Sequence, residues 1–374
     1  MKRKKILVIM GTRPEVIKLA PVYQAIKQEN NLFETKLLVT AQHREMLDQP
    51  LANFQIQPDY DLDIMRHQQD LFDVTINGLR GLKAALTEYQ PDCLLVQGDT
   101  TTTFIGGLAA FYLKIPVGHV EAGLRTYNKF SPYPEEVNRR LTSCLADFHF
   151  APTLQSKQNL IKENISEQSI WITGNTTIDA LLWTIQQTTP QLSELLPTAT
   201  YEALFSKFIL LTTHRRESFG EPLKRTLTAV DEIASKFQDV HIIFPVHRNP
   251  NVRQAIDEVL QKRSNIHLIE PLDYTNFAHL MSMATIILTD SGGVQEEGPS
   301  LNKPILVLRD ITERPEGVTA GVAKLLGTNK DKIVQEVSRL LTDEGYYKTM
   351  TGKQNPYGDG DASKRIVKVL KENL

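Results

Sequence analysis

Opposed charges crowd the segment "HVEAGLRTYNKFSPYPEEVNRR", residues 119–140, which begins at the end of a short apolar run. It holds carboxylates at Glu121, Glu135 and Glu136, and Asp99 closely follows an earlier apolar run. Carboxylates that lie close together acquire different pKa values, so that one can give a proton while another takes one. The sequence therefore predicts proton transfer, with Asp99, Glu121 and Glu135 as acid and base candidates. The alternative interpretation is that each carboxylate only caps a helix or pairs with an arginine.

A glycine turn in "DSGGVQEE", residues 290–297, is the strongest candidate for binding phosphate. Ser291, Gly292 and Gly293 are expected to form a tight turn into a helix. The free backbone N–H groups and the helix dipole at such a turn favour an anion. Glu297, one turn further on, is placed to accept hydrogen bonds from ribose hydroxyls, as Glu296 beside it also is. The alternative is a capped helix with solvated glutamates.

Basic side chains supply further anion-binding candidates. "GTRPE" places Arg13 in the first turn of an expected helix, with Lys18 one turn later, and "HRRE" places His214 beside two arginines. Arginine recognises phosphate oxygens with two parallel hydrogen bonds. The structural alternatives are an Arg13–Glu15 ion pair and a histidine that serves only the fold. The arginines of the segment 119–140 are expected to hold its carboxylates or its loop in place: Arg125, Arg139 and Arg140.

Several function classes lack their sequence signals. No GxGxxG follows an apolar run, no GxxxxGK[ST] occurs, and the nine histidines form no HxH, HxxxH or HExxH pattern. We therefore expect neither a nicotinamide cofactor, nor a P-loop, nor a metal. The net charge of −2 gives no reason to expect nucleic acid or an anionic membrane as partner. No run of 18 apolar residues predicts a membrane span. Cys93 and Cys144 are expected to be buried, reduced thiols, which fits the cytoplasm.

The elements that must position these residues alternate along the chain. Apolar runs predict β-strands at residues 6–10, 36–40, 93–97, 115–120, 148–151, 208–213, 240–246, 266–270, 285–290 and 304–309. Helix-spaced apolar residues separate them, as at Val16, Leu19 and Tyr23. Because the runs are continuous, they favour parallel sheets covered on both faces, in a doubly wound α/β fold.

The domain organisation follows from length and from the strand ends. At roughly 150 residues per domain, 374 residues predict two domains. Residues 186–205, with two prolines, predict a surface connection, and we expect the boundary at or before it, with domains at 1–172 and 173–357. Charged groups with glycine or proline follow seven predicted strands, and ligands bind at such strand ends. We therefore expect a polar site in a cleft between the domains.

Seven strings occur in order along nearly the whole chain: "GTRPEVIK", "QGDTTTT", "HVEAGLRT", "SPYPEEVNRR", "THRRESFG", "DSGGVQEE" and "RDITERPE". Together they resemble the non-hydrolysing UDP-N-acetylglucosamine 2-epimerases of bacteria. The resemblance implies two Rossmann-like domains arranged as in glycosyltransferases of the B type, with the C-terminal helix, residues 358–374, returning to the first domain. It implies UDP-GlcNAc and UDP-ManNAc as the interconverted pair, a homodimer, and a product used for cell-surface polysaccharide.

The resemblance also implies roles for single residues. The catalytic positions of the family match Asp99, Glu121, Glu135 and His214. The positions that hold UDP match Arg13, Lys18, His214, Ser291, Gly292, Gly293, Glu297 and Arg314; Phe277 falls near uracil and Arg139 lines the site. A second nucleotide sugar can act as an activator in this family, at positions that match Gln42, His43, Arg215 and His247. The chain departs from the activator pattern at Gln68, in place of arginine, and at Glu45.

The chemistry limits the routes to epimerisation. The proton on C2 of the sugar is not next to a carbonyl, so that a base cannot simply remove and return it. The sequence has no dinucleotide-binding motif, which argues against oxidation by a nicotinamide cofactor. The remaining route is elimination of UDP to a 2-acetamidoglucal, followed by re-addition of UDP. Four alternatives stay open: a hydrolysing epimerase that releases free ManNAc, a glycosyltransferase on the same fold, a non-catalytic sensor of sugar nucleotides, and a close relative that acts on a modified sugar such as a diacetamido uronate.

Overall fold

The computed structural model describes residues 2–40, 44–65, 69–215 and 219–374, and its chain forms two compact units. Unit 1 comprises Met1–Trp183 and Gly358–Leu374, and unit 2 comprises Thr184–Tyr357. The division falls inside helix α7 (Thr176–Gln187) rather than after residue 172. The first part of α7 belongs to unit 1, because residues 176–181 are buried there. The partly buried Trp183 extends this packing, with its ring 4.9 Å from the Phe54 ring, centroid to centroid.

Unit 1 contains a fully parallel sheet in the order β3-β2-β1-β4-β5-β6-β7. Its strands are β1 (Lys4–Met10), β2 (Phe33–Val39), β3 (Tyr60–Asp61), β4 (Cys93–Gln97), β5 (Val117–Val120), β6 (Phe148–Ala151) and β7 (Ile170–Ile172). The direction of strand addition reverses between β1 and β4. At such a switch point the loops after the two strands diverge and leave room for a ligand.

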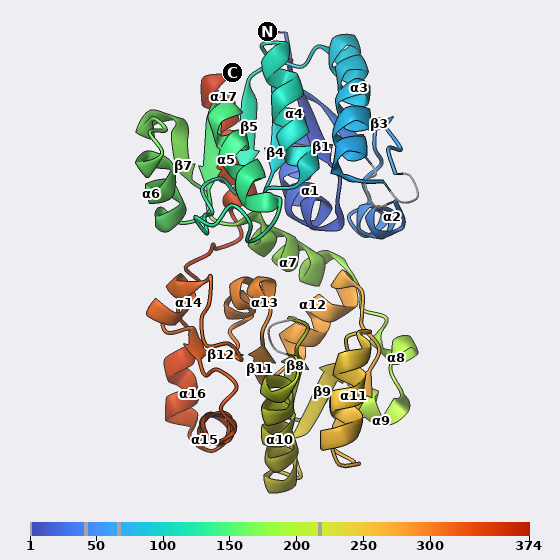
Figure 1. The fold of residues 1–374 in the computed structure, drawn as a ribbon, viewed down its shortest axis with the longest axis vertical. Helices are drawn as coiled ribbons and strands as arrows, with labels where there is room; N and C mark the ends of the chain where they lie inside the picture. The colour runs from blue at the N-terminus through green and yellow to red at the C-terminus, as the bar shows by residue number, and fades with distance from the viewer. Residues whose placement is uncertain (1, 41–43, 66–68, 216–218) are drawn as a thin grey trace. The chain divides into compact units, whose positions relative to one another are not determined.

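The helices of unit 1 cover this sheet (Figure 1). They are α1 (Arg13–Gln28), α2 (Arg44–Asn53), α3 (Leu71–Tyr89), α4 (Thr101–Tyr112), α5 (Glu135–Leu145), α6 (Leu154–Lys162), η1 (Glu167–Ser169), α7 and α17 (Ala362–Asn373). Figure 1 shows α17, in red, among the blue and green elements of unit 1, where it packs against α1. Asp179 fixes this return, since its carboxylate accepts the backbone N–H of Ser363 at 2.7 Å.

Unit 2 repeats the plan with a parallel sheet in the order β10-β9-β8-β11-β12-β13. Its strands are β8 (Phe208–Thr212), β9 (His241–Pro245), β10 (Ile266–Ile269), β11 (Ile286–Thr289), β12 (Ile305–Val307) and β13 (Ala323–Leu325). Its helices are α8 (Leu192–Leu195), α9 (Thr198–Ala203), α10 (Glu221–Lys236), α11 (Pro250–Val259), α12 (Tyr274–Met283), α13 (Gly292–Glu297), η3 (Gly298–Leu301), α14 (Pro315–Thr319), α15 (Lys330–Thr342) and α16 (Glu344–Met350). The switch point lies between β8 and β11. The predicted doubly wound α/β architecture is confirmed in both units.

The structure corrects several expectations. Three short strands, β3, β7 and β13, lacked an apolar run long enough to predict them. Residues 186–205, expected as a plain connection, contain the short helices α8 and α9. Cys93 is buried as expected, but Cys144 is exposed, because it lies on the outer face of α5. In the described part of the chain, no helix is long and apolar enough to cross a membrane.

Candidate active site

Two of the predicted carboxylates stand at the ends of neighbouring strands in unit 1. Asp99 follows β4 and Glu121 follows β5, and these strands pair in parallel with Gln97 opposite Val120. A Cβ added to Gly98 would lie 3.6 Å from Oε2 of Glu121, so the turn that carries Asp99 passes close to that carboxylate. Glu121 itself has φ of 63°, a left-handed conformation that is uncommon outside glycine. Such strained residues gather at functional sites.

Three side chains converge on the Glu121 carboxylate. Nζ of Lys18 donates to both of its oxygens, at 2.6 and 2.8 Å, and Nδ2 of Asn175 donates to Oε1 at 3.2 Å. The amide of Gln97 also donates to Oε2. Glu121 is buried, and so many donors suit an ionised carboxylate. Lys18, expected to hold UDP, thus lies beside a predicted catalytic residue, while Gln97 and Asn175 were missed by the sequence reading.

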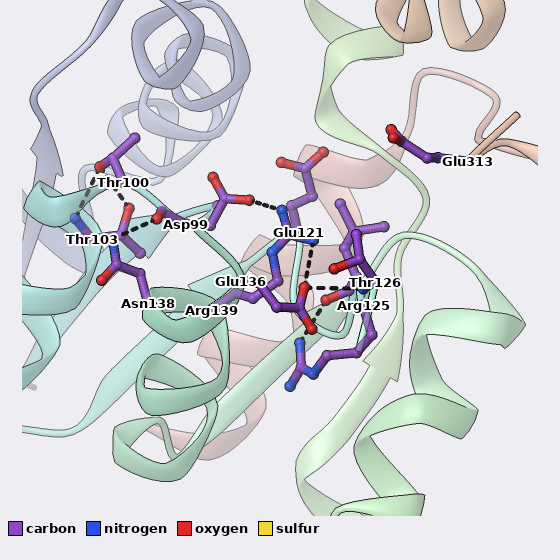
Figure 2. A network of polar contacts seen from close by, with 12 residues as sticks. Asp99, Thr100, Thr103, Glu121, Arg125, Thr126, Glu136, Asn138, Arg139 and Glu313 are labelled. Carbon is purple, nitrogen blue, oxygen red and sulfur yellow. Dashed lines mark hydrogen bonds and ion pairs between the residues drawn. The ribbon is translucent and has the colours of Figure 1, made fainter. Parts of the chain in front are cut away.

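Asp99 has a different environment. Its carboxylate pairs with the guanidinium of Arg139, and its backbone carbonyl accepts from Nδ2 of Asn138 at 3.0 Å (Figure 2). Burial raises the pKa of Asp99 and outweighs the opposing effect of Arg139, and the negative charge of Glu121 raises that pKa further. The two carboxylates are therefore held differently. One is surrounded by donors, and the other is biased toward its protonated form.

Glu135 opens helix α5 and stands apart from this network. Its Oε2 atom is buried but has no hydrogen-bond partner among the described residues. A buried carboxylate oxygen without a partner is costly, so its position calls for an explanation. At the first position of a helix, the positive end of the dipole favours its charge. The Oε2 atom of Glu135 could therefore accept a hydrogen bond or a proton from a ligand.

The arginines of the segment 119–140 fix its loop, each through a carboxylate. Arg125 donates to both oxygens of Glu163, at 2.9 and 2.7 Å, and Arg140 lies 3.4 Å from the same carboxylate. Arg139 instead joins Asp99 to Glu136. These contacts anchor the loop, but they are made to Glu163, Asp99 and Glu136 rather than to the expected Glu121 and Glu135.

The loop after β1 is anchored by Glu15, which the sequence suggested only as an ion-pair partner of Arg13. Glu15 is buried and accepts from the N–H of Gly11 at 3.1 Å and from the hydroxyls of Thr12, Thr100 and Thr103 at 2.7, 2.9 and 3.2 Å. Burial raises its pKa despite these hydrogen bonds. A Cβ at Gly11 would lie 2.2 Å from Oγ1 of Thr102, so the close approach of the two loops requires glycine. Glu15 thereby ties the loop of exposed Arg13 to the loop of Asp99.

His119, on strand β5, contacts the turn at Gly98 that carries Asp99. Its Nε2 atom lies 2.7 Å from the carbonyl of Gly98, and since a carbonyl only accepts, Nε2 carries the proton. Nδ1 is buried without a partner in the described chain. Burial lowers the pKa of His119 to about 3, so the ring is neutral at ordinary pH. A histidine on an apolar strand gave no signal of this role in the sequence.

In unit 2, Asp290 organises the loop that carries His214. The buried carboxylate accepts from the backbone N–H groups of His214 and Arg215, both at 3.0 Å, and from the hydroxyl of Thr213 at 3.1 Å. It also lies 3.2 Å from Nδ1 of His214. Although burial alone raises the pKa of Asp290, the hydrogen bonds from His214 and Arg215 hold it below its ordinary value. The His214 side chain is partly exposed.

Two guanidiniums converge over the glycine turn at the start of α13. A Cβ at Gly292 would lie 3.6 Å from Nη2 of Arg215 and 3.9 Å from Nη2 of Arg314, while nothing lies within 4 Å of one at Gly293. Arg314 is held by Glu296, which it contacts through Nε. Ser291 precedes the helix, and its side chain makes no capping hydrogen bond. Cations above exposed backbone amides form a setting for an anion such as phosphate.

The remaining predicted residues fall into three groups. Glu297 accepts from the hydroxyl of Tyr274 at 3.1 Å, which joins α13 to α12, the helix that also carries partly buried Phe277. The His247 ring stacks on that of His214 with centroids 6.3 Å apart, so this part of the suggested activator set adjoins Arg215. Gln42, His43 and Gln68 lie outside the described residues, and the side chain of Glu45 is also not described.

Within the described ranges, no three His, Cys, Asp or Glu side chains gather as a metal site would require.

Comparison with known proteins identifies the family. Residues 24–371 match the family model described as UDP-N-acetylglucosamine 2-epimerase. The chain is 54% identical over 372 residues to the UDP-N-acetylglucosamine 2-epimerase of Escherichia coli K12, with 99% of each chain covered. It also resembles the crystal structure of UDP-GlcNAc 2-epimerase from Neisseria meningitidis bound to UDP-GlcNAc, at 49% identity and a TM-score of 0.84, covering 99% of this chain and 100% of that one.

A more distant similarity concerns the fold alone. The crystal structure of the glycotransferase of kitacinnamycin matches with a TM-score of 0.65 at 11% identity, covering 100% of this chain and 99% of that one. The two-unit α/β architecture is thus shared with a glycosyltransferase, as the B-type resemblance implied. The family model and the close relatives extend over nearly the whole length and include the segments that carry Asp99, Glu121 and the glycine turn of α13. The chain therefore belongs to the UDP-N-acetylglucosamine 2-epimerase family.

Proposed function

We propose that this protein interconverts UDP-GlcNAc and UDP-ManNAc without releasing free sugar, by elimination of UDP and its re-addition. The observation that carries the proposal is the pair of unlike carboxylates at the ends of β4 and β5. Glu121 accepts from Lys18, Gln97 and Asn175, whereas burial raises the pKa of Asp99. Inversion at C2 needs a proton taken from one face of the sugar and a proton given to the other. Two carboxylates of different proton affinity can supply both.

The proposed first step breaks two bonds. A carboxylate of unit 1 takes the C2 proton, the C2–H electron pair forms the C1–C2 double bond, and UDP leaves C1 with the electron pair of the C1–O bond. In the second step the double bond takes a proton at the opposite face of C2, and UDP adds back to C1. Atoms and charge balance, so no redox cofactor enters. Asp99, Glu121 and Glu135 are the proposed proton carriers.

UDP is the proposed ligand of the cationic turn in unit 2. The leaving diphosphate gains charge as the C1–O bond breaks, and preorganised donors stabilise such charge best. Arg314, Arg215, His214 and the amides that follow Ser291 form that set. Glu297 and Phe277 are the proposed neighbours of the uridine. Arg13 and Lys18, on the first turns of α1, are the proposed basic groups of unit 1.

Proton NMR of the reaction mixture tests the proposal against the hydrolysing alternative. UDP-GlcNAc incubated with the protein in EDTA should give UDP-ManNAc and reach a constant ratio, and the same ratio should be reached from UDP-ManNAc. Free ManNAc and UDP should stay absent after equilibrium is reached. Steady release of free ManNAc would instead assign the hydrolysing reaction, and transfer only in the presence of an added acceptor would assign a glycosyltransferase.

We also propose that the protein works as a homodimer in the cytoplasm and supplies cell-surface polysaccharide synthesis. Helices α3 and α4 pack side by side (Figure 1) and expose large apolar side chains, among them Phe72 at 77% and Tyr112 at 69%. A hollow of about 410 Å³ lies between them, lined by Leu79, Arg80, Lys83, Ala109, Tyr112 and Leu113. An apolar surface of this kind suits a self-complementary contact with a second copy.

Sedimentation velocity tests the dimer and its interface. The wild type should sediment as a dimer and Tyr112→Glu as a monomer. The matched control is Phe205→Glu, which charges an equally exposed aromatic residue in unit 2, 73% exposed, and should stay dimeric. A wild-type monomer would contradict the dimer, and a dimeric Tyr112→Glu variant would place its interface elsewhere.

A further inference from the structure

We propose that Glu136 is a positioning residue for the epimerisation. It holds the Arg139 guanidinium between its own carboxylate and that of Asp99, and so sets how strongly Arg139 pairs with Asp99. This inference rests on the proposed function of Asp99 in proton transfer and adds a residue to which the sequence reading gave no role. Glu136 lies next to Glu135 in α5, but its side chain is fully buried.

The guanidinium of Arg139 is shared between two carboxylates. Nη1 lies 3.3 Å from Oε2 of Glu136, and Nη2 contacts Oδ2 of Asp99, as Figure 2 shows. Both Arg139 and Glu136 are buried, so solvent screens their interaction little. One positive charge therefore serves two negative groups. If Glu136 were neutral, no second negative charge would hold the guanidinium back from a closer approach to Asp99.

Glu136 itself is fixed by the backbone of the loop between the two predicted catalytic glutamates. Its Oε2 accepts the N–H of Thr126 and its Oε1 accepts the N–H of Tyr127, both at 3.0 Å. Tyr127 has φ of 61°, a conformation that a bulky residue rarely adopts and that these hydrogen bonds help to hold. Glu136 thus joins the loop, helix α5 and Asp99 through contacts that leave its carboxylate little freedom.

The protein contains a matched pair that lacks this connection. Glu163 receives two hydrogen bonds from Arg125, which also donates to the carbonyl of Leu124 in the same loop. This pair therefore has the same chemistry and anchors the same loop. Among the described residues this pair does not contact Asp99, and the charged groups that shift the pKa of Asp99 are Arg139, Glu121 and Lys18. Glu163→Gln consequently separates loop anchoring from an effect on Asp99.

The consequence concerns the proton affinity of Asp99. A general acid or base works best when its pKa lies near the operating pH. Burial and Glu121 raise the pKa of Asp99, and Arg139 opposes them. By holding the guanidinium between the two carboxylates, Glu136 limits how far Arg139 lowers the pKa of Asp99. Replacing Glu136 by a neutral group should strengthen the Arg139–Asp99 pair and lower the pKa of Asp99.

The experiment titrates Asp99 directly and measures turnover on the same variants. Protein labelled with ¹³C at the aspartate side-chain carboxyl is followed by NMR against pH, and the Asp99 signal is assigned by its loss in Asp99→Asn. In Glu136→Gln the midpoint of Asp99 should move to lower pH, with kcat reduced roughly 10- to 100-fold and KM unchanged. In Glu163→Gln the midpoint and kcat should match the wild type. In Arg139→Met, which removes the cation, the midpoint should move to higher pH.

An unchanged or higher midpoint in folded Glu136→Gln would overturn the proposal, and so would an equal shift in Glu163→Gln. If Glu136→Gln does not fold, Arg139→Met decides, because an unchanged midpoint there would show that Arg139 does not act on Asp99. A wild-type protein without epimerase activity would count against the proposed function. The titration midpoints would still decide whether Glu136 and Arg139 control Asp99.

Discussion

The ammonium of Lys18 bridges both oxygens of the Glu121 carboxylate, at 2.6 and 2.8 Å. Lys18 comes from the second turn of α1 and Glu121 from the end of β5, so the contact crosses the switch point of the unit 1 sheet. Lys18 favours the charged form of this buried carboxylate, so proton transfer to Glu121 must work against that attraction. A ligand that neutralises Lys18 would relieve it. The contact therefore couples the charge bound beside α1 to the reactivity of Glu121.

Glu121→Gln should reduce kcat by roughly 10²- to 10⁴-fold, the usual loss when a general acid or base is removed. The amide keeps the shape of the side chain but cannot transfer the proton. Affinity for UDP, measured by calorimetry, should change far less than kcat, because most of the groups assigned to UDP lie in unit 2 and Glu121 itself is assigned none of the contacts to UDP. Wild-type turnover in Glu121→Gln would show that this carboxylate serves only the fold.

Glu135→Gln should reduce activity strongly while it leaves stability nearly unchanged. Because Oε2 of Glu135 has no partner among the described residues, the substitution breaks no known contact of that atom. The free energy of unfolding should change by less than about 0.5 kcal/mol, whereas kcat should fall by roughly 10²-fold or more. Denaturant unfolding and steady-state kinetics on the same preparation check both parts. A stable variant with full activity would remove Glu135 from the mechanism.

Arg314→Ala should weaken UDP binding by roughly 10- to 100-fold, since a hydrogen bond to a charged group contributes about 1.5–3 kcal/mol. Turnover should fall as well, because the leaving diphosphate loses the same contact. Arg263→Ala is the control: Arg263 pairs with Asp231 in unit 2 at 2.8 Å and is assigned no ligand. Equal UDP affinities in the two variants would contradict the assignment of Arg314.

His119→Gln should make the protein less sensitive to acid. Burial lowers the pKa of His119 to about 3, from an ordinary value of 6.5. Between pH 6.5 and 3 the unfolded chain binds a proton that the folded chain refuses, so the histidine makes stability fall as pH falls through this window. Glutamine can still donate to the Gly98 carbonyl but does not titrate. Tm should therefore decline less between pH 6.5 and 4 in this variant, while exposed His247→Gln should follow the wild type. Parallel declines in both variants would refute the account of His119.

The fold was largely predictable because continuous apolar runs and helix-spaced segments alternate. Ten runs predicted strands, and each of them overlaps one in the structure. β7 and β13 have three residues each and β3 has two, too few for a pattern, and they form because neighbouring strands offer them partners. The domain boundary was less predictable, since α7 continues through it as one helix.

The grouping of the candidate side chains could be predicted where reactive residue types follow strands, as at Asp99, Glu121 and the glycines at the start of α13. Supporting residues were not, because their roles depend on partners far along the chain. Glu15 reaches Thr100, and Asn175 reaches Glu121. Lys18, which the sequence predicts as a UDP ligand, also bridges the Glu121 carboxylate, a contact that no local pattern indicates. Local sequence shows which groups can react, whereas only the fold shows which groups hold them.

Deuterium incorporation tests the central claim most directly. UDP-GlcNAc is incubated with the wild-type protein in heavy water, with EDTA and without a nicotinamide cofactor, and the sugar protons are followed by NMR. Proton removal by a carboxylate that exchanges with solvent predicts deuterium at C2, and at no other carbon, in both UDP-GlcNAc and UDP-ManNAc. Interconversion that keeps the original hydrogen at C2 would contradict the account.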